Sequence, residues 1–283
     1  MKRILVNADD FGRHELINQA VERAVMAGCL RSATLMPGGL AFDSAVAAAK
    51  RQKALGVGIH FTLVNGYPIL PPKEIPSLVT ADGVFWEDHT VFVKRFLTGK
   101  IRLTEVRAEL AAQLRKMERA GLSISHADSH QHMHTLPGII DIVLDLVQAA
   151  GIRAIRAPRT PFFCGEFGGI GQLIGRLGLG TLARAAACKA KRRGLAVPDH
   201  FAGIVAGEAV SEPYLLDIVR QLKPGVTEVM MHPGTDNGVL IPDCGWDHDF
   251  EAELMAIVSP AVLQLAADEK VEFINFHSLY AEG

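Results

Sequence analysis

Short segments rich in β-branched residues alternate along the chain with longer segments whose apolar residues recur at helical spacing. The short segments are typical of strands, and the longer ones are typical of amphipathic helices. The predicted strands cover residues 3–7, 32–36, 56–60, 125–128, 152–156, 200–205, 227–231 and 271–276. The predicted helices cover residues 17–28, 42–52, 103–120, 138–150 and 213–222. This alternation amounts to seven or eight βα units, and it favours a parallel sheet with helices outside it.

No change of composition and no internal repeat divides the chain, which has 283 residues. Barrels of the α/β class commonly form one domain of roughly 250 residues. We therefore expect a single α/β domain over residues 1–283, either an open doubly wound sheet or a closed barrel. Residues 160–199 follow neither period clearly, and we expect a helical or irregular insertion there.

The overall composition is that of a globular protein with a full core, because 49% of the residues are hydrophobic and 21% are charged. Lys and Arg number 29 against 31 Asp and Glu, so the formal net charge is −2. A chain without a basic field does not hold a polyanion by counterion release. Nucleic acid is therefore not an expected partner.

Targeting and membrane-spanning segments are not expected either. Asp9 and Asp10 interrupt the chain before the apolar region of a secretory signal could form. The most apolar stretch, 139–152, contains Asp141 and Asp145 and is shorter than the roughly 20 residues of a spanning helix. The four cysteines have no CxxC spacing, so neither a disulfide framework nor a thiolate zinc site is indicated. These features favour a cytoplasmic protein.

Ionisable residues stand at the carboxyl ends of five predicted strands. They are Asp9 and Asp10, His60, a cluster that comprises His126, Asp128, His130, His132 and His134, then Arg156, and finally His232. In parallel α/β folds this edge carries the active site, because strand ends hold side chains rigidly and the following loops shape a pocket. A closed barrel brings five strand ends together, whereas an open sheet spreads them along a line. The distribution therefore favours a (β/α) barrel.

These residue types are suited to metal chemistry. Two imidazoles and one carboxylate commonly bind a divalent metal ion that keeps positions open for water and substrate. Zinc is the expected ion, and manganese, cobalt and, with more water ligands, magnesium also fit. Asp9 and Asp10 can both reach one pocket at a strand-to-loop transition, one to bind the metal and one to accept a proton. The combination predicts metal-assisted hydrolysis.

Four segments resemble the signatures of the YdjC-like carbohydrate deacetylases, a family that includes chitooligosaccharide deacetylases. They are Asn7-Ala8-Asp9-Asp10-Phe11-Gly12, Gly58-Ile59-His60-Phe61-Thr62-Leu63, the stretch from His126 to His134, and Glu228-Val229-Met230-Met231-His232-Pro233-Gly234. The resemblance runs nearly from end to end. It implies a distorted, TIM-like (β/α) barrel that removes N-acetyl groups from amino sugars with one divalent metal ion.

The resemblance also implies a role for individual residues. It implies Asp10, His60 and His130 as metal ligands, Asp9 as the general base, and His232 as the acid that protonates the leaving amine.

Other residues of these segments are candidates for contacting the ligands or the substrate, namely Asp128, His126, His132 and His134. Arg156 could orient the Asp9 carboxylate or a sugar hydroxyl, or form a salt bridge with a helix. The remaining histidines have no motif to recruit them and are interpreted as structural: His14, His89, His200, His248 and His277.

Residues 167–198 depart from the compact sugar deacetylases, because they are rich in Gly and Leu, carry several Lys and Arg, and contain no acidic residue. This segment is similar to the hopanoid-biosynthesis-associated branch of the family, which implies a lipid-linked acetylated glucosamine as substrate. Its leucines and basic end suit a helix that rests on anionic headgroups, so peripheral membrane contact is one interpretation. A solvated helical hairpin that covers the barrel is the other.

Two further functions stay open at this point. The ligand set alone does not exclude hydrolysis of another bond such as a phosphoester, although only Arg156 and Arg159 lie near the strand ends. A non-catalytic protein that binds a sugar or a lipid is the second alternative, and it is disfavoured because every expected catalytic position is filled. The sequence leaves open whether the chain forms a homodimer.

Overall fold

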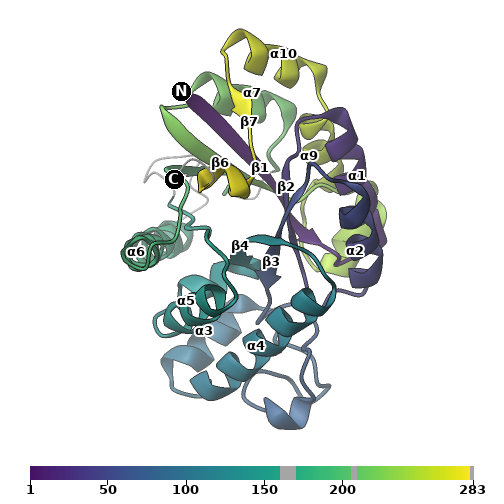
Figure 1. Cartoon of the computed structure of the whole chain (residues 1–283). Coiled ribbons are helices and arrows are strands. Elements are labelled where there is room, and N and C mark those ends of the chain that lie inside the picture. Colours follow the sequence, from purple (N-terminus) through teal and green to yellow (C-terminus); the bar gives the residue numbers. More distant parts are fainter. Residues whose placement is uncertain (160–169, 205–208, 281–283) are drawn as a thin grey trace.

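The computed structural model describes residues 1–159, 170–204 and 209–280. A parallel sheet lies at the centre, and helices surround it (Figure 1). The strands are β1 (Lys2–Phe11), β2 (Ser32–Leu35), β3 (Gly56–Phe61), β4 (Ile124–Ser129), β5 (His200–Ala202), β6 (Gly225–Met231) and β7 (Glu272–Phe273).

The helices include three short 3-10 segments. The α-helices are α1 (Glu15–Ala27), α2 (Phe42–Arg51), α3 (His89–Leu97), α4 (Leu103–Arg119), α5 (Ile139–Ala149), α6 (Ile170–Arg192), α7 (Glu212–Arg220), α8 (Asn237–Cys244), α9 (Phe250–Ile257) and α10 (Pro260–Asp268). The 3-10 segments are η1 (Pro72–Glu74), η2 (His130–Thr135) and η3 (Phe276–Leu279).

The seven-stranded sheet has the order β4-β3-β2-β1-β6-β5, and β7 pairs with β1 off this path. Every strand pairing is parallel. Single parallel bridges continue the pairing beyond β4, from Ala127 to Ile155 and from Ala154 to Ala196, a short distance before β5 begins. The sheet therefore curls into a distorted barrel, which confirms the expected fold class.

Side chains along β1 alternate between the two faces of the sheet, as the pleat of a strand requires. Val6 and Ala8 belong to the main apolar core, which also includes residues of the surrounding helices. Leu5 belongs to a separate apolar cluster, and Asn7 and Asp9 are buried polar residues on the same side as Leu5. One strand thus supplies the helix-facing core and the interior of the barrel at once.

The interior of the barrel has an apolar layer and a polar layer. The apolar layer lies at the amino ends of the strands and consists of Leu5, Ala154, Val226, Ile274 and Phe276. Closer to the carboxyl ends, the interior positions are occupied by His60 on β3, Asp128 on β4 and Glu228 on β6, all buried. The polar layer is the floor of the candidate site.

Most predicted elements match the structure within a few residues, and the differences have local causes. The segment predicted as a strand at 152–156 makes only single bridges, and the strand predicted at 271–276 shrinks to β7 and the turn η3. The helices α3, α8, α9 and α10 were not predicted. Each has only eight or nine residues, which is too short to show a clear helical period.

The described part of the expected insertion at 160–199 is α6 and the residues that follow it. Residues 160–169 and the side chains of residues 170–177 lie outside the described residues. The basic end of α6 packs on α5 through two ion pairs: Lys189 Nζ lies 2.8 Å from Asp141 Oδ2, and Arg193 Nη1 lies 2.7 Å from Asp145 Oδ1. Part of the basic charge of this segment is therefore neutralised within the chain.

Among the described residues, no single helix has both the length and the apolar composition needed to cross a membrane. Helices α9 and α10, which are bent by 45° relative to each other, meet these two criteria only as a pair.

Gly58 on β3 faces the imidazole of His126, so a methyl group at Gly58 would overlap this ring. The ring cannot move away easily, because it stacks on Phe276 with centroids 3.5 Å apart and its Nδ1 lies 2.8 Å from the hydroxyl of Ser125. We therefore expect Gly58→Ala to lower the free energy of unfolding by about 1–3 kcal/mol in urea denaturation.

The matched control is Gly178→Ala on α6, where an added methyl group meets nothing within 4 Å. We expect this change to raise helix stability by about 0.5–1 kcal/mol or to leave the unfolding free energy unchanged. Equal effects of the two substitutions would show that the contact between Gly58 and His126 is not restrictive.

Candidate active site

A cavity of about 590 Å³ opens at the carboxyl ends of the strands. Among the residues that line it are Asp9, Asp10, His60, His130, His132 and His232. They come from the ends of β1, β3 and β6 and from the turn after β4. The structure thus brings together side chains that are far apart in the sequence, as the strand-end distribution predicts.

Asp9 and Asp10 both reach this cavity because β1 departs from regular geometry between them. Ala8 pairs with Ala33 and Phe11 pairs with Leu35, so β1 contains one more residue than β2 between these two pairs. This is a β-bulge, which redirects side chains next to it. Asp10 takes a φ of 59°, in the left-handed region, and its carboxylate turns to the same side as that of Asp9. Two adjacent carboxylates therefore share one pocket.

Asp10, His60 and His130 form a compact group that could hold a metal ion. Asp10 Oδ1 lies 3.2 Å from His60 Nε2 and 2.9 Å from His130 Nδ1. One ligand atom from each of the three residues lies within 4.8 Å of the other two. The second ring nitrogen of His130, Nε2, is buried and has no hydrogen-bond partner, and the same holds for His60 Nε2. Two unpartnered imidazole nitrogens beside a carboxylate fit a divalent cation.

The other nitrogen of His60 is fixed by a carboxylate. His60 Nδ1 lies 2.7 Å from Asp128 Oδ1, an arrangement that orients metal-binding histidines and raises their basicity. Burial lowers the pKa of His60, but the charges of Asp128 and Asp9 and contact with Asp10 outweigh it and raise the pKa to about 10. A metal ion bound at His60 Nε2 would have to displace the proton from this nitrogen.

Arg156 is fully buried beneath this group and contacts three carboxylates. Its Nη1 and Nη2 each lie 2.6 Å from one oxygen of Asp9, and its Nε lies 2.6 Å from Glu228 Oε1. Nη1 also lies 2.7 Å from Asp128 Oδ2, an ion pair outside hydrogen-bond geometry. These contacts give Asp9 a fixed orientation through a bidentate pair. Asn7 Nδ2 adds a hydrogen bond of 2.8 Å to Asp9 Oδ1.

The polar layer contains more negative than positive charge. Asp10 and Asp128 have their pKa values lowered, because nearby histidines and, for Asp128, Arg156 outweigh the effect of burial. Burial raises the pKa of Glu228 to about 7, although Arg156 opposes this. Four carboxylates lie in this layer with one guanidinium and the His60 imidazole, so a further cation is electrostatically favourable. This excess is a second reason why a divalent ion fits here.

The turn after β4 separates the histidines of the sequence cluster. Gln131 and His132 adopt φ values of 49° and 59°, so the chain reverses directly after His130. His134 lies away from the cavity: its Nδ1 is 2.6 Å from the Ser129 hydroxyl and its Nε2 is 3.1 Å from the carbonyl oxygen of Arg156. His134 therefore holds the turn against the barrel, whereas His132 lines the cavity.

His126 is not among the residues that line the cavity. It occupies the same face of β4 as Asp128, two residues nearer the amino end of the strand, and this places it against Phe276 in the apolar layer. Burial holds the pKa of His126 well below its usual range. The residue is a neutral histidine of the barrel interior.

His232 also lines the cavity and lies close to Asp9. Its Nε2 is 4.0 Å from Asp9 Oδ2, and its backbone N–H donates to the carboxylate of Glu253. Burial lowers the pKa of His232, and the charges of Asp9, Asp10 and Glu253 oppose this only in part. The imidazole is therefore predominantly neutral near pH 7 and stands close to a carboxylate.

Sequence reasoning missed three residues of this region. Glu228 could have been found as a charged residue at an interior position of an apolar strand. Glu253 lies on α9, and His248 lies in the loop before it, with His248 Nε2 3.4 Å from Glu253 Oε1. Neither belongs to a strand end, so no local signal links them to His232. His248, which has no sequence motif to recruit it and was interpreted as structural, lines the cavity.

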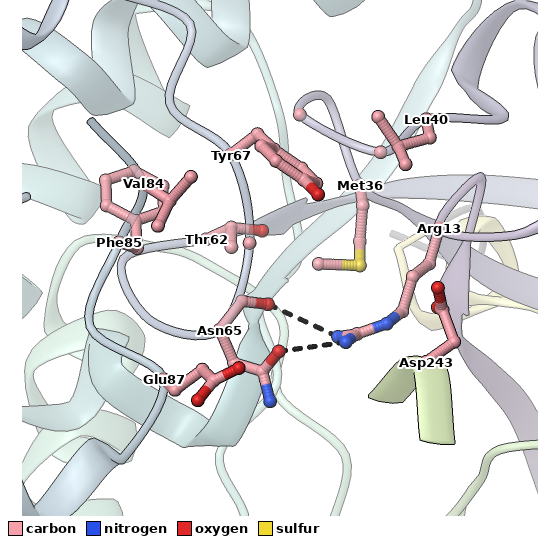
Figure 2. Close-up of a pocket in the computed structure, with 13 residues that line it drawn as sticks. Arg13, Met36, Leu40, Thr62, Asn65, Tyr67, Val84, Phe85, Glu87 and Asp243 are labelled. Carbon is pink, nitrogen blue, oxygen red and sulfur yellow. Dashed lines mark hydrogen bonds between the residues drawn. The ribbon is translucent and has the colours of Figure 1, made fainter. Parts of the chain in front are cut away.

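A smaller pocket of about 140 Å³ adjoins the cavity (Figure 2). Figure 2 shows the Arg13 guanidinium pointing at Asn65, which accepts hydrogen bonds of 3.2 Å at its backbone oxygen and 2.8 Å at its side-chain oxygen. Glu87 and Tyr67 also line this pocket. The two spaces share Arg13, Asn65 and Glu87 as walls, so a polar ligand in the cavity can extend into the pocket.

Comparison with known sequences gives a consistent result. The sequence model of the YdjC-like protein family matches residues 3–268. The chain is 29% identical to a carbohydrate deacetylase of Brevibacillus brevis over 283 residues, which covers 98% of this chain and 99% of that one. It is 30% identical to a carbohydrate deacetylase of Homo sapiens over 294 residues, which covers 94% and 88% of the two chains.

A solved structure shows the same fold. It is that of an Enterococcus faecalis V583 protein named for cellobiose-phosphate cleavage, and it superposes with a TM-score of 0.76 over 98% of both chains. The two sequences are 24% identical, so this similarity bears on the fold alone.

Removing the buried guanidinium is expected to destabilise the protein in a pH-dependent way. Arg156→Met leaves Asp128 and Glu228 buried without their cation, which costs about 3–5 kcal/mol of unfolding free energy at pH 7. Without the guanidinium, burial raises the pKa of these carboxyls above the unfolded values. The folded variant then binds more protons than the unfolded chain, and its stability falls as the pH rises.

The loss should therefore be smaller at pH 5 than at pH 7, as measured by urea denaturation at both values. The control is Arg115→Met on the exposed face of α4, for which we expect a change within about 0.5 kcal/mol at either pH. A loss for Arg156→Met that does not depend on pH would argue against the charge network as its cause.

Proposed function

Since the chain belongs to the YdjC-like protein family, we propose that it is a metal-dependent hydrolase that removes the N-acetyl group from an acetylated amino sugar. The observation that carries this proposal is the convergence of Asp10, His60 and His130 beside the oriented carboxylate of Asp9. Relatives named as carbohydrate deacetylases, which match most of the chain, support the choice of bond.

Asp10, His60 and His130 would hold the metal ion. A divalent metal bound there would polarise the acetamide carbonyl and lower the pKa of a water molecule. Zinc is our first choice because two imidazoles and a carboxylate are typical zinc ligands, and cobalt, manganese and magnesium are the alternatives. Asp128 supports the site by holding His60 Nδ1, which leaves His60 Nε2 directed at Asp10.

Asp9 is proposed as the general base. Both of its oxygens are bound by Arg156, so its carboxylate cannot rotate away from the cavity. The same guanidinium balances the negative charge that Asp9 carries between proton transfers. Asp9 does not need to bind the metal, because the neighbouring Asp10 supplies that carboxylate through the bulge of β1.

His232 is proposed as the group that protonates the leaving amine. A neutral imidazole 4.0 Å from Asp9 Oδ2 can receive the proton that Asp9 has accepted once the two groups move slightly closer. It then becomes a cation next to the leaving nitrogen, where Glu253 stabilises it electrostatically. In this proposal Asp9 activates the attacking water, and His232 protonates the nitrogen of the amide bond that breaks.

The walls of the cavity support a sugar with a further group attached. Trp246 and Tyr67 are partly exposed aromatic residues at the cavity and at the adjoining pocket, and their rings suit the faces of pyranose units. Leu179 of α6, Ile204 and Met230 form an apolar part of the cavity wall. This wall supports our finer proposal, a lipid-linked N-acetylglucosamine of the hopanoid type, with membrane contact through residues 167–198.

Acetate release tests the proposed activity. Metal-stripped protein would be incubated with N-acetylglucosamine, chitobiose and an N-acetylglucosaminyl lipid, each with added zinc, cobalt, manganese or magnesium. We expect acetate only after a metal is restored. A preference for chitobiose would support occupation of the adjoining pocket by a second ring, and a preference for the lipid would support the finer proposal. Protein that binds metal but releases no acetate from any substrate would contradict the deacetylase assignment.

Two substitutions separate the proposed base from the proposed ligands. Asp9→Asn should retain the metal content of the wild type and lose turnover by about 10²–10⁴-fold, because a general base contributes roughly that factor. His60→Ala should lose both metal and turnover. Metal content would be measured by atomic emission after dialysis, alongside acetate release.

The control for the first change is Asp82→Asn at an exposed turn, which should leave metal content and turnover unchanged. Loss of the metal in Asp9→Asn, or full activity in His60→Ala, would overturn these role assignments.

A further inference from the structure

A second group of side chains that could bind a metal ion lies at the same cavity. It consists of His232 at the end of β6, His248 in the loop before α9, and Glu253 on α9. One ligand atom from each of these residues lies within 4.8 Å of the other two. None of them belongs to the Asp10 group, so the two groups are separate sets of ligands.

The contacts of this group leave one nitrogen available. His248 Nε2 is buried and has no hydrogen-bond partner of acceptable geometry, although Glu253 Oε1 lies 3.4 Å away. Trp246 stacks on a face of the His248 ring, with centroids 3.9 Å apart and an interplanar angle of 19°. The indole thus restricts the His248 ring while its Nε2 faces Glu253. A buried imidazole nitrogen left unpaired beside a carboxylate calls for a ligand.

We propose that His232, His248 and Glu253 form a second cation site, which takes zinc or a similar transition metal ion. Two imidazoles and a carboxylate are nitrogen and oxygen donors of the kind that zinc and cobalt accept, whereas calcium and magnesium favour oxygen ligands. The binding itself does not depend on the deacetylase assignment. Its consequence for catalysis does, because it engages the histidine that we propose as the acid.

The second site is weaker than the first for two structural reasons. Glu253 already accepts hydrogen bonds from the backbone N–H groups of Val210 and His232, so its lone pairs are shared. The group also contains one carboxylate, whereas the polar layer around the first group has an excess of them. Occupation is therefore expected only after the Asp10 group is filled.

An ion at the second site would inhibit the enzyme. A ring nitrogen of His232 bound to a metal cannot accept or deliver a proton, so the leaving amine would lose its proton donor. Excess zinc should then reduce turnover below the maximum reached with one ion per chain. The mechanism is a competition between the proton and the metal ion for one imidazole.

The experiment counts bound ions in the full-length protein. Metal-stripped wild-type protein would be titrated with cobalt(II) in equilibrium dialysis, and tryptophan fluorescence would be followed in parallel because Trp246 contacts both His232 and His248. We expect two ions per chain, with quenching of fluorescence during the second binding step. His248→Gln should bind only the first ion tightly, with the affinity of the second site reduced by at least about tenfold.

Two control variants make the result specific. His89→Gln removes an exposed histidine that lines the same cavity but belongs to neither group, and it should still bind two ions. His60→Gln should lose the tight ion and keep the weaker one, with its fluorescence response. Inhibition by excess zinc would be compared between wild type and His248→Gln, each normalised to its own activity at one ion per chain.

Several outcomes would overturn the second site independently of the proposed activity. A wild-type protein that binds one cobalt ion and releases acetate would support the deacetylase assignment and contradict the second site. The same holds if His248→Gln binds two ions as tightly as the wild type. Because the wild-type count needs no variant, an unfolded His248→Gln protein would not leave the proposal untested.

Discussion

The buried guanidinium of Arg156 is the contact on which the rest of the site depends. It extends from the segment after α5 to Asp9 on β1, Asp128 on β4 and Glu228 on β6, and so joins three strands at one depth of the barrel. A buried charge is tolerated only when charged and hydrogen-bonded partners replace its hydration, and here each guanidinium nitrogen lies 2.6 Å from a carboxylate oxygen. Since Asp128 in turn holds His60, the network sets the direction of both a proposed base and a proposed ligand.

The same network is electrostatically incomplete, and this links stability to cation binding. Asp10 adds a fourth carboxylate to the layer, which contains one guanidinium. Binding of a cation would therefore stabilise the folded chain. The group formed by His232, His248 and Glu253 lacks this excess, because Glu253 is its single carboxylate and is held by backbone N–H groups. The unequal affinities that we propose for two ions would therefore follow from the distribution of buried charge and not from the types of ligand, which are the same in both groups.

Much of the barrel and of the convergence at its edge could be predicted from the sequence, because alternation along a strand and the position of a strand end are local properties. Depth within the barrel was not predictable: His126 and Asp128 share a face of β4, and only the packing of Phe276 shows that His126 belongs to the apolar layer. The sequence did not show which histidines of the cluster face the cavity, because the turn that separates them requires left-handed backbone at two consecutive residues. Glu253 and His248 could not be identified as site residues from the sequence, because their approach to His232 depends on how α9 packs. This packing is a long-range property that no nearby residues encode.

Backbone strain is concentrated where the alternation of side chains has to be broken. Asp10, Asn65, Gln131 and His132 have positive φ and line the cavity, and Lys270 is the further non-glycine residue with positive φ in the described part of the chain. A left-handed conformation costs such a residue about 1–2 kcal/mol. A regular strand turns every second side chain away from the site, so adjacent residues such as Asp9 and Asp10 can share a pocket only if the backbone departs from that geometry. The regular sheet therefore supplies rigid positions, and the local departures from it bring the proposed ligands together.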